Sequence, residues 1–187
     1  KKAAKVTLQP VNRFGFDAAI IFSDILLIPW ALNRNVRFEA GIGPLLDPLN
    51  KPDQIDTRCL DNIPRNLAPV ADAIKLTKSS LPKETALIGF AGAPWTLITY
   101  IAEGKSSRDF SKARLWAWEE KKALDKLIEI LIEATISFLS IQAEAGAECL
   151  MLFDSWASAV PATQRDWLVI NPTRDIVTGV RQRGFSQ

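Results

Sequence analysis

Three short runs of apolar residues constrain the fold more than any other feature of the sequence. They are AAIIFS (18–23), ALIGFA (86–91) and CLMLFD (149–154). None of them alternates polar with apolar residues, which is typical of strands that are covered on both faces in a parallel sheet. Small, polar or helix-breaking residues follow each run. We therefore predict three buried parallel strands.

Helical patterns lie between these runs and on both sides of them. Apolar residues recur at helical spacing in segments that begin with proline or end at glycine, as helices often do. In the last segment, Asn171 and Pro172 suggest an N-cap followed by a first-turn proline. The predicted helices are the start of the chain, 64–81, 94–102, 107–119, 121–145, 163–170 and 171–183.

The region 33–60 differs from the rest of the chain because it is rich in Gly, Pro and Asn. It could hold one edge strand, Val36–Glu39, followed by an extended excursion. Excursions of this length are uncommon as plain connections and are often functional. We therefore expect this region to contribute to a site.

Strands that alternate with helices predict an α/β fold with a parallel sheet and right-handed crossovers. An open doubly wound sheet for nucleotides would usually carry a glycine fingerprint. The segment GFAGAPWT has Gly89 and Gly92 but neither G-x-G-x-x-G nor a following Lys-Ser/Thr pair. A closed (β/α)8 barrel needs about 250 residues. A barrel would therefore make residues 1–187 a single partial domain of a longer protein, and the choice between the two kinds of sheet stays open at this point.

Composition excludes several kinds of partner and site. The net charge is +2 and Lys and Arg form no dense run, so we expect neither nucleic-acid nor membrane binding. The longest apolar helical stretch contains Glu129 and Glu133, which does not suit a transmembrane helix. The chain has no His, and Cys59 and Cys149 lack metal-ligand spacing, so we expect no metal and a reducing cytoplasm.

Polar side chains occur where the predicted strands end, which is where parallel α/β folds gather their chemistry. Asp24 follows the first strand, Tyr100 lies in the helix after the second, and Ser155 follows the third. Each has a structural alternative. Asp24 could be the N-cap of ILLIPWAL, Tyr100 an ordinary buried tyrosine, and Ser155 a cap of the next segment. Glu103 suits a solvated helix surface.

The strings FDAAIIFSDIL, LIGFAGAPWTLITYIAEG and LFDSWAS occur in this order. Together they resemble the uroporphyrinogen decarboxylase family over essentially the whole chain. The resemblance implies a (β/α)8 barrel, of which this chain would be strands two to four with their helices. It also implies a cofactor-free carboxy-lyase of haem biosynthesis that works as a homodimer. Such an enzyme removes the four acetate carboxyls of uroporphyrinogen III to give coproporphyrinogen III.

The resemblance also implies roles for individual residues. The aspartate of the family's FSDIL motif falls on Asp24, which would face the pyrrole N–H groups and stabilise positive charge during decarboxylation. Tyr100 and Ser155 fall on substrate-binding positions, and Phe153 on an apolar wall of the cleft. The family's arginine motif and its late histidine motif do not occur in this chain. We therefore expect the chain alone to be inactive and marginally soluble.

Two alternatives stay open at the level of the sequence. A zinc-dependent corrinoid or thiol methyltransferase of the same barrel superfamily would need ligands that this chain lacks, although a longer protein could supply them. A barrel fragment without catalytic activity could instead act only as a binding module.

Overall fold

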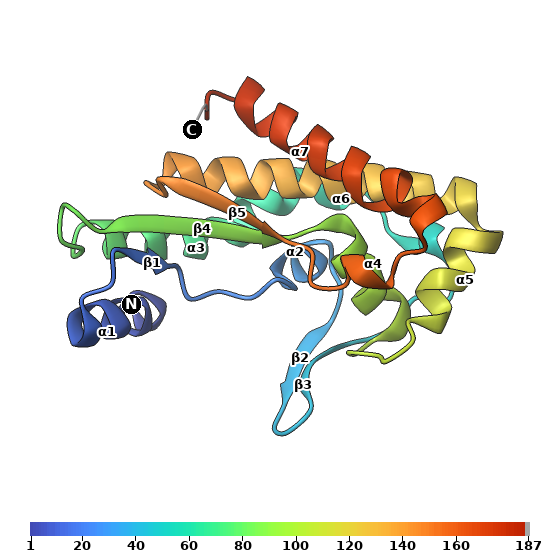
Figure 1. Ribbon diagram of the computed structural model, residues 1–187, viewed down its shortest axis with the longest axis horizontal. Coiled ribbons are helices and arrows are strands. Elements are labelled where there is room, and N and C mark those ends of the chain that lie inside the picture. The colour runs from blue at the N-terminus through green and yellow to red at the C-terminus, as the bar shows by residue number, and fades with distance from the viewer. Residues whose placement is uncertain (186–187) are drawn as a thin grey trace.

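The computed structural model describes residues 1–185, and a parallel sheet forms its centre (Figure 1). The sheet contains β1 (Ala18–Ile20), β4 (Ala86–Gly92) and β5 (Cys149–Phe153), in the order β1-β4-β5. Both neighbouring pairs are parallel. All three predicted strands are confirmed, although β1 is shorter than the apolar run at 18–23.

The helices that flank the strands form one outer layer in chain order (Figure 1). These helices are α1 (Lys2–Phe14), α3 (Ile63–Lys78), α6 (Lys121–Glu144) and α7 (Asn171–Gln182). Helix α1 packs on α3, α3 on α6, and α6 on α7. A sheet that grows in chain order beneath a single helical layer is an arc of a (β/α)8 barrel, because a doubly wound sheet carries helices on both faces. The predicted partial barrel is confirmed.

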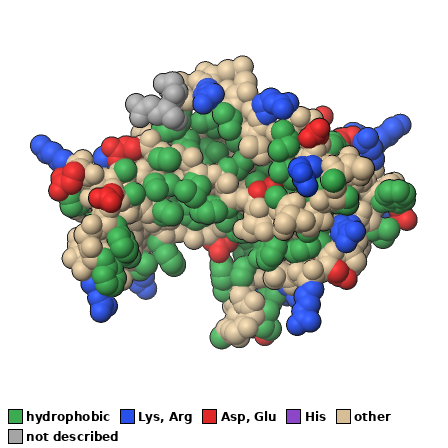
Figure 2. Space-filling model, viewed as in Figure 1, with side chains coloured by type: hydrophobic (Ala, Val, Ile, Leu, Met, Phe, Trp, Pro, Cys, Tyr) green, Lys and Arg blue, Asp and Glu red, His purple; other side chains and the backbone are tan. Residues whose placement is uncertain are grey.

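The two faces of the sheet differ in burial. On the face toward the helices, Ala19, Leu87 and Ile74 of α3 are among the residues of one buried cluster. On the other face, Ile20 is 44% exposed and Phe22 is 61% exposed. Figure 2 shows hydrophobic side chains gathered over the strands and a recess between α1 and the β2–β3 hairpin. The face that a closed barrel would bury is therefore open in this chain.

The remaining elements lie mainly at the carboxyl ends of the strands. Strands β2 (Val36–Glu39) and β3 (Gly43–Leu46) pair as an antiparallel hairpin, so the edge strand predicted at 36–39 is confirmed. The other α-helices are α2 (Leu27–Ala31), α4 (Pro94–Glu103) and α5 (Ser111–Glu119). Short 3-10 segments span Pro52–Gln54, Thr57–Asn62, Ala157–Ala159 and Ala162–Gln164.

The prediction that Asn171 caps a separate helix is wrong. A π-helical turn at Asp166–Ile170 runs directly into α7, and the Asn171 side chain accepts a hydrogen bond from Arg174 Nη1 at 3.0 Å. Pro172 lacks an N–H, and its ring would crowd the Leu168 carbonyl in a regular α-helix. A wider π turn relieves that crowding, so the two predicted helices are continuous.

Glu103, predicted on a solvated helix surface, is partly exposed but also has backbone partners that the sequence did not indicate. Its Oε1 accepts hydrogen bonds from the backbone N–H groups of Lys112 at 2.8 Å and Ala113 at 3.3 Å. These N–H groups lie in the first turn of α5, where the N-cap residue Phe110 provides no side-chain acceptor. Glu103 therefore caps α5 from the end of α4, which satisfies donors that a helix leaves unpaired.

Where β1 leaves the sheet, a buried glutamine makes the hydrogen bonds to β4 that β1 no longer makes. The last bond between the two strands joins Ile21 N–H to the Ile88 carbonyl, and Phe90 is the next residue of β4 that faces the same edge. Gln142 of α6 is fully buried, accepts from Phe90 N–H at 2.9 Å and donates to the Phe90 carbonyl at 2.8 Å. The end of β4 is thus held by β5 on one edge and by Gln142 on the edge that β1 has left.

No helix in residues 1–185 is both long and apolar enough to span a membrane.

Candidate active site

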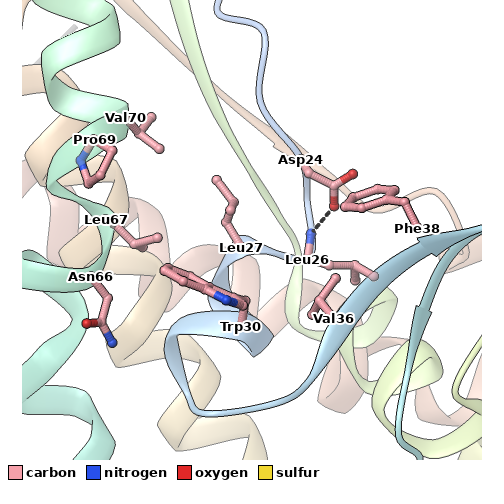
Figure 3. Close-up of a pocket in the computed structure, with 10 residues that line it drawn as sticks. All are labelled: Asp24, Leu26, Leu27, Trp30, Val36, Phe38, Asn66, Leu67, Pro69 and Val70. Carbon is pink, nitrogen blue, oxygen red and sulfur yellow. Dashed lines mark hydrogen bonds between the residues drawn. The ribbon is translucent and has the colours of Figure 1, made fainter. Parts of the chain in front are cut away.

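Asp24 lies just beyond the point where β1 separates from β4. The Phe22 N–H donates to Thr7 Oγ1 of α1 at 2.8 Å, which directs the chain away from the sheet. Asp24 Oδ1 then accepts from Leu26 N–H at 2.7 Å and closes a turn before α2 (Figure 3). Because α2 begins at Leu27 with Leu26 as its N-cap, Asp24 does not occupy the cap position itself.

The Asp24 carboxylate lines an apolar cavity of about 290 Å³ between α2, α3 and β2. A neighbouring cavity of about 420 Å³ reaches α1 and shares Asp24, Phe38 and Val70 with the first. Figure 3 shows the carboxylate directed toward the Phe38 ring. The residues that line the first cavity are Asp24, Leu26, Leu27, Trp30, Val36, Phe38, Asn66, Leu67, Pro69 and Val70.

The electrostatic environment of Asp24 leaves its charge without a cationic partner. Burial raises the pKa of the Asp24 carboxyl, and the Leu26 N–H offsets part of that shift. Within residues 1–185, the ion pairs involve other carboxylates and none includes Asp24. A half-buried carboxylate without a cation is costly for a fold to maintain, so it suits a site that a cationic or N–H-rich ligand completes.

Tyr100 is brought close to Asp24 although 76 residues separate them in the sequence. It lies on α4, the helix entered from β4, and is only 8% exposed. Burial raises the pKa of the Tyr100 hydroxyl, and the negative charge of Asp24 raises it further. The Trp156 indole acts in the opposite direction on this pKa. Asp24 and Tyr100 are therefore within electrostatic range of each other.

Phe153 and Ser155 lie at the carboxyl end of β5, as their positions in the sequence predict. The Phe153 ring packs edge-on against Phe90, with 5.4 Å between ring centroids and 81° between ring planes. Ser155 is exposed in the loop that follows. Neither residue lines the cavities at Asp24. Tyr100 does not line them either, so Asp24 and Tyr100 are linked through the effect of the Asp24 charge on the Tyr100 pKa, and Phe153 and Ser155 lie on a neighbouring part of the same strand-end face.

Phe38 is a candidate site residue that sequence reasoning missed. It is 67% exposed, yet it lines both cavities that flank Asp24. Its hairpin is held at the base, where Asp47 pairs with Arg37 at 2.7 Å and Leu46 N–H donates to the Gly104 carbonyl at 2.8 Å. The composition of region 33–60 indicated a functional excursion, but it did not indicate which side chain would face Asp24.

Asp154 is the second residue that the sequence analysis did not single out. Its carboxylate follows β5 as Asp24 follows β1, and it accepts a hydrogen bond from Thr96 Oγ1 at 2.7 Å. Burial raises the pKa of Asp154, and the hydrogen bonds from Thr96 oppose that rise. The signal was a carboxylate at the end of a buried strand, the same signal that identified Asp24.

The donors for a metal ion do not converge in the part of the chain that the structure describes. No three His, Cys, Asp or Glu side chains of residues 1–185 lie close enough together to hold a metal.

An arc of parallel strands under one helical layer, with carboxylates and apolar cavities at the strand ends, is the arrangement of a partial (β/α)8 barrel. A family model described as uroporphyrinogen decarboxylase (URO-D) matches residues 1–185. The chain belongs to the uroporphyrinogen decarboxylase family.

Curated relatives agree with this assignment. The chain is 46% identical over 183 residues to a uroporphyrinogen decarboxylase of Maricaulis maris, covering 98% of this chain and 53% of the relative. It is 44% identical to that of Rhodospirillum rubrum, with the same coverage. It is 46% identical to that of Caulobacter vibrioides, covering 100% of this chain and 52% of the relative. The chain thus spans about half the length of the curated relatives it matches.

A solved structure, a methyltransferase from Methanosarcina mazei, resembles the fold with a TM-score of 0.77. The match covers 95% of this chain and 53% of that protein at 16% sequence identity. At this identity the likeness supports the barrel-type fold alone.

Proposed function

We propose that a full-length protein containing this chain decarboxylates uroporphyrinogen III to coproporphyrinogen III without a cofactor. The observation that carries the proposal is the Asp24 carboxylate, which lies half-buried at the end of β1 beside apolar cavities and has no ion-pair partner among residues 1–185. The curated relatives that cover nearly all of this chain are named uroporphyrinogen decarboxylase.

The chemistry requires an electron sink next to each acetate side chain. Adding a proton to the ring carbon next to the one that bears the acetate creates a cation that is shared between the acetate-bearing carbon and the ring nitrogen. The bond to the carboxylate then breaks, carbon dioxide leaves, and the electron pair of that bond neutralises the cation. Protonation of the new methylene and loss of the ring proton restore an aromatic pyrrole that bears a methyl group.

In this proposal Asp24 stabilises the cation while it forms. A fixed negative charge in a site with little water lowers the energy of a positive transition state more than the same charge in water would. Tyr100 and Ser155 bind polar groups of the substrate, and Phe153 with its neighbour Phe90 forms an apolar wall. The Phe38 ring, next to Asp24, adds a flat apolar surface suited to a pyrrole.

Replacing Asp24 by Asn in the full-length protein tests this role. Asn retains an oxygen that can accept from Leu26 N–H but removes the charge, so we expect turnover to fall about 10²- to 10³-fold. Asp72→Asn on the exposed side of α3 is the matched control and should leave turnover unchanged. Coproporphyrinogen production measured by chromatography gives the rates. Unchanged turnover in Asp24→Asn would show that the assignment is wrong.

The two alternatives predict different results for the full-length protein. A binding module would bind a porphyrinogen in an optical titration but would not release carbon dioxide. A zinc-dependent methyltransferase would contain stoichiometric zinc in elemental analysis, with ligands from outside residues 1–185. The proposal further includes a homodimer in the cytoplasm, and sedimentation of the full-length protein tests the dimer.

A further inference from the structure

The Thr96 hydroxyl joins two strand-end segments that carry candidate site residues. Thr96 lies in the first turn of α4 and is fully buried. Its Oγ1 donates to Asp154 Oδ1 at 2.7 Å and accepts from the Trp156 N–H at 3.2 Å. A threonine hydroxyl has one donor hydrogen and can also accept, so this single group serves both partners.

Two further bonds tie the same segments together. Trp95 Nε1 donates to the Trp156 carbonyl at 3.1 Å, and the Ala93 N–H donates to the Phe153 carbonyl at 2.8 Å. The segment from Phe153 to Trp156 is therefore fixed on the beginning of α4 through its backbone. Ser155 lies inside this segment.

The hydrogen bonds between the beginning of α4 and the segment Phe153 to Trp156, here called the α4–β5 junction, also place Trp156 near Tyr100. Tyr100 lies four residues after Thr96, on the same side of α4. The Trp156 ring packs against the Phe110 ring, with 5.0 Å between the ring centroids. The Trp156 indole also lowers the pKa of Tyr100. The indole N–H is buried beside the Tyr100 hydroxyl and lowers this pKa as a hydrogen-bond donor would, although the two groups fall short of full hydrogen-bond geometry.

We propose that Thr96 is a positioning residue that holds the segment after β5 on α4 and thereby fixes Trp156 and Ser155 relative to Tyr100. The effect on catalysis rests on the proposed function, whereas the effect on Tyr100 does not. A second threonine provides the comparison. Thr99 is 1% exposed on the same helix, but its hydroxyl donates to the Thr96 carbonyl within α4 at 2.7 Å.

The first experiment uses the 187-residue chain, in which Tyr100 is the only tyrosine. Tyrosinate absorbance during a pH titration therefore reports Tyr100 alone, and circular dichroism confirms folding. Thr96→Val preserves shape and removes both bonds, so water should reach Tyr100 and lower its pKa. Thr96→Ser and Thr99→Val should leave the titration unchanged. Identical titrations for Thr96→Val and Thr99→Val would overturn the proposal.

A second variant keeps the proposal testable if Thr96→Val does not fold. Asp154→Leu removes the acceptor from the other side of the junction and leaves α4 intact, so it should shift the Tyr100 titration in the same direction. An unshifted titration in folded Asp154→Leu would contradict the proposal.

The second experiment measures kcat and KM in the full-length protein. Thr96→Val should lower kcat/KM on the order of 10²-fold, because displacements of about 1 Å at a site have effects of that size. Thr96→Ser should restore most of the loss, and Thr99→Val should match wild type. Suppose that Thr96→Val shifts the Tyr100 titration but neither the full-length wild type nor any variant decarboxylates the substrate. The proposed function then fails and the positioning role stands. If wild type is active and Thr96→Val equals it, the positioning role fails.

Discussion

Asp24 shows how a single residue can be unfavourable for stability and useful for function. Its carboxylate is half-buried among apolar side chains and has one hydrogen bond, from Leu26. Desolvation of a charged group without a compensating cation costs free energy in the unliganded protein. Positive charge that develops on a bound substrate would recover that cost during the reaction.

The pH dependence of stability tests this view of Asp24. Burial raises the pKa of Asp24 in the folded chain above 3.8, its ordinary value in the unfolded chain. At a pH between the unfolded and the folded pKa, the folded chain therefore binds more protons than the unfolded chain. Asp24 therefore lowers the free energy of unfolding as pH rises through that window, and the loss is complete above it. Asp24→Asn should be more stable than wild type at neutral pH.

Urea unfolding of the 187-residue chain at several pH values measures this difference. The two curves should converge at acid pH, where the Asp24 carboxyl is neutral, and Asp72→Asn should follow wild type throughout. A variant that is less stable than wild type at neutral pH would contradict the assignment of a desolvated carboxylate.

At the scale of the element, the region where β1, β4 and α6 meet shows how one strand can leave the sheet without leaving the hydrogen-bonding groups of its neighbour unpaired. The strand β1 must leave the sheet early to bring Asp24 to the cavity, which leaves the Phe90 N–H and carbonyl without strand partners on the β1 side of β4. Gln142 supplies both missing bonds from α6. Its side chain reaches the strand by passing over Gly89, where a Cβ would lie 2.7 Å from Gln142 Oε1.

Gly89→Ala should therefore destabilise the chain by about 2–3 kcal/mol, because it would displace Gln142 and leave buried backbone groups unpaired. Gln142→Ala should also destabilise it by a similar amount. In a double-mutant cycle, the cost of Gly89→Ala should be much smaller when Gln142 is already Ala. Additive costs in urea unfolding would show that the glycine is needed for another reason.

At the scale of the whole molecule, the arc of strands leaves one apolar face open. Ile20, which alternates with the buried Ala19 and Ile21, faces away from the helical layer and is 44% exposed, and Phe22, just beyond the strand, is 61% exposed. In a closed barrel this side forms the packed interior. An open apolar face of this kind favours association between copies.

We expect the 187-residue chain to self-associate through this face. Replacing both Ile20 and Phe22 by Thr should weaken self-association by about 10-fold or more, since burying each large apolar side chain contributes about 1.5–3 kcal/mol. Phe14→Thr, which changes a 63% exposed ring at the end of α1, is the control and should have little effect. Sedimentation over a range of concentrations measures the change, and equal association of all three proteins would exclude this face.

Much of the architecture could be predicted from the sequence because it depends on local patterns. The apolar runs that became β1, β4 and β5 and the helical period of α6 are properties of short segments. The cap assigned to Asn171 was wrong because Pro172 acts within a longer, continuous helix. Glu103 looked solvated because its partners lie on the next helix.

The sequence by itself determined the order of strands and helices and the carboxylate at the end of β1, since each follows from residue types within a few positions, whereas the barrel class came from the resemblance to a known family. Only the tertiary structure decided that the charge of Asp24 acts on Tyr100, that Phe38 lines the same cavities as Asp24, and that Thr96 holds the segment after β5. Those contacts join residues that are far apart in the chain. Their geometry is set by how helices pack on strands, which no local pattern records.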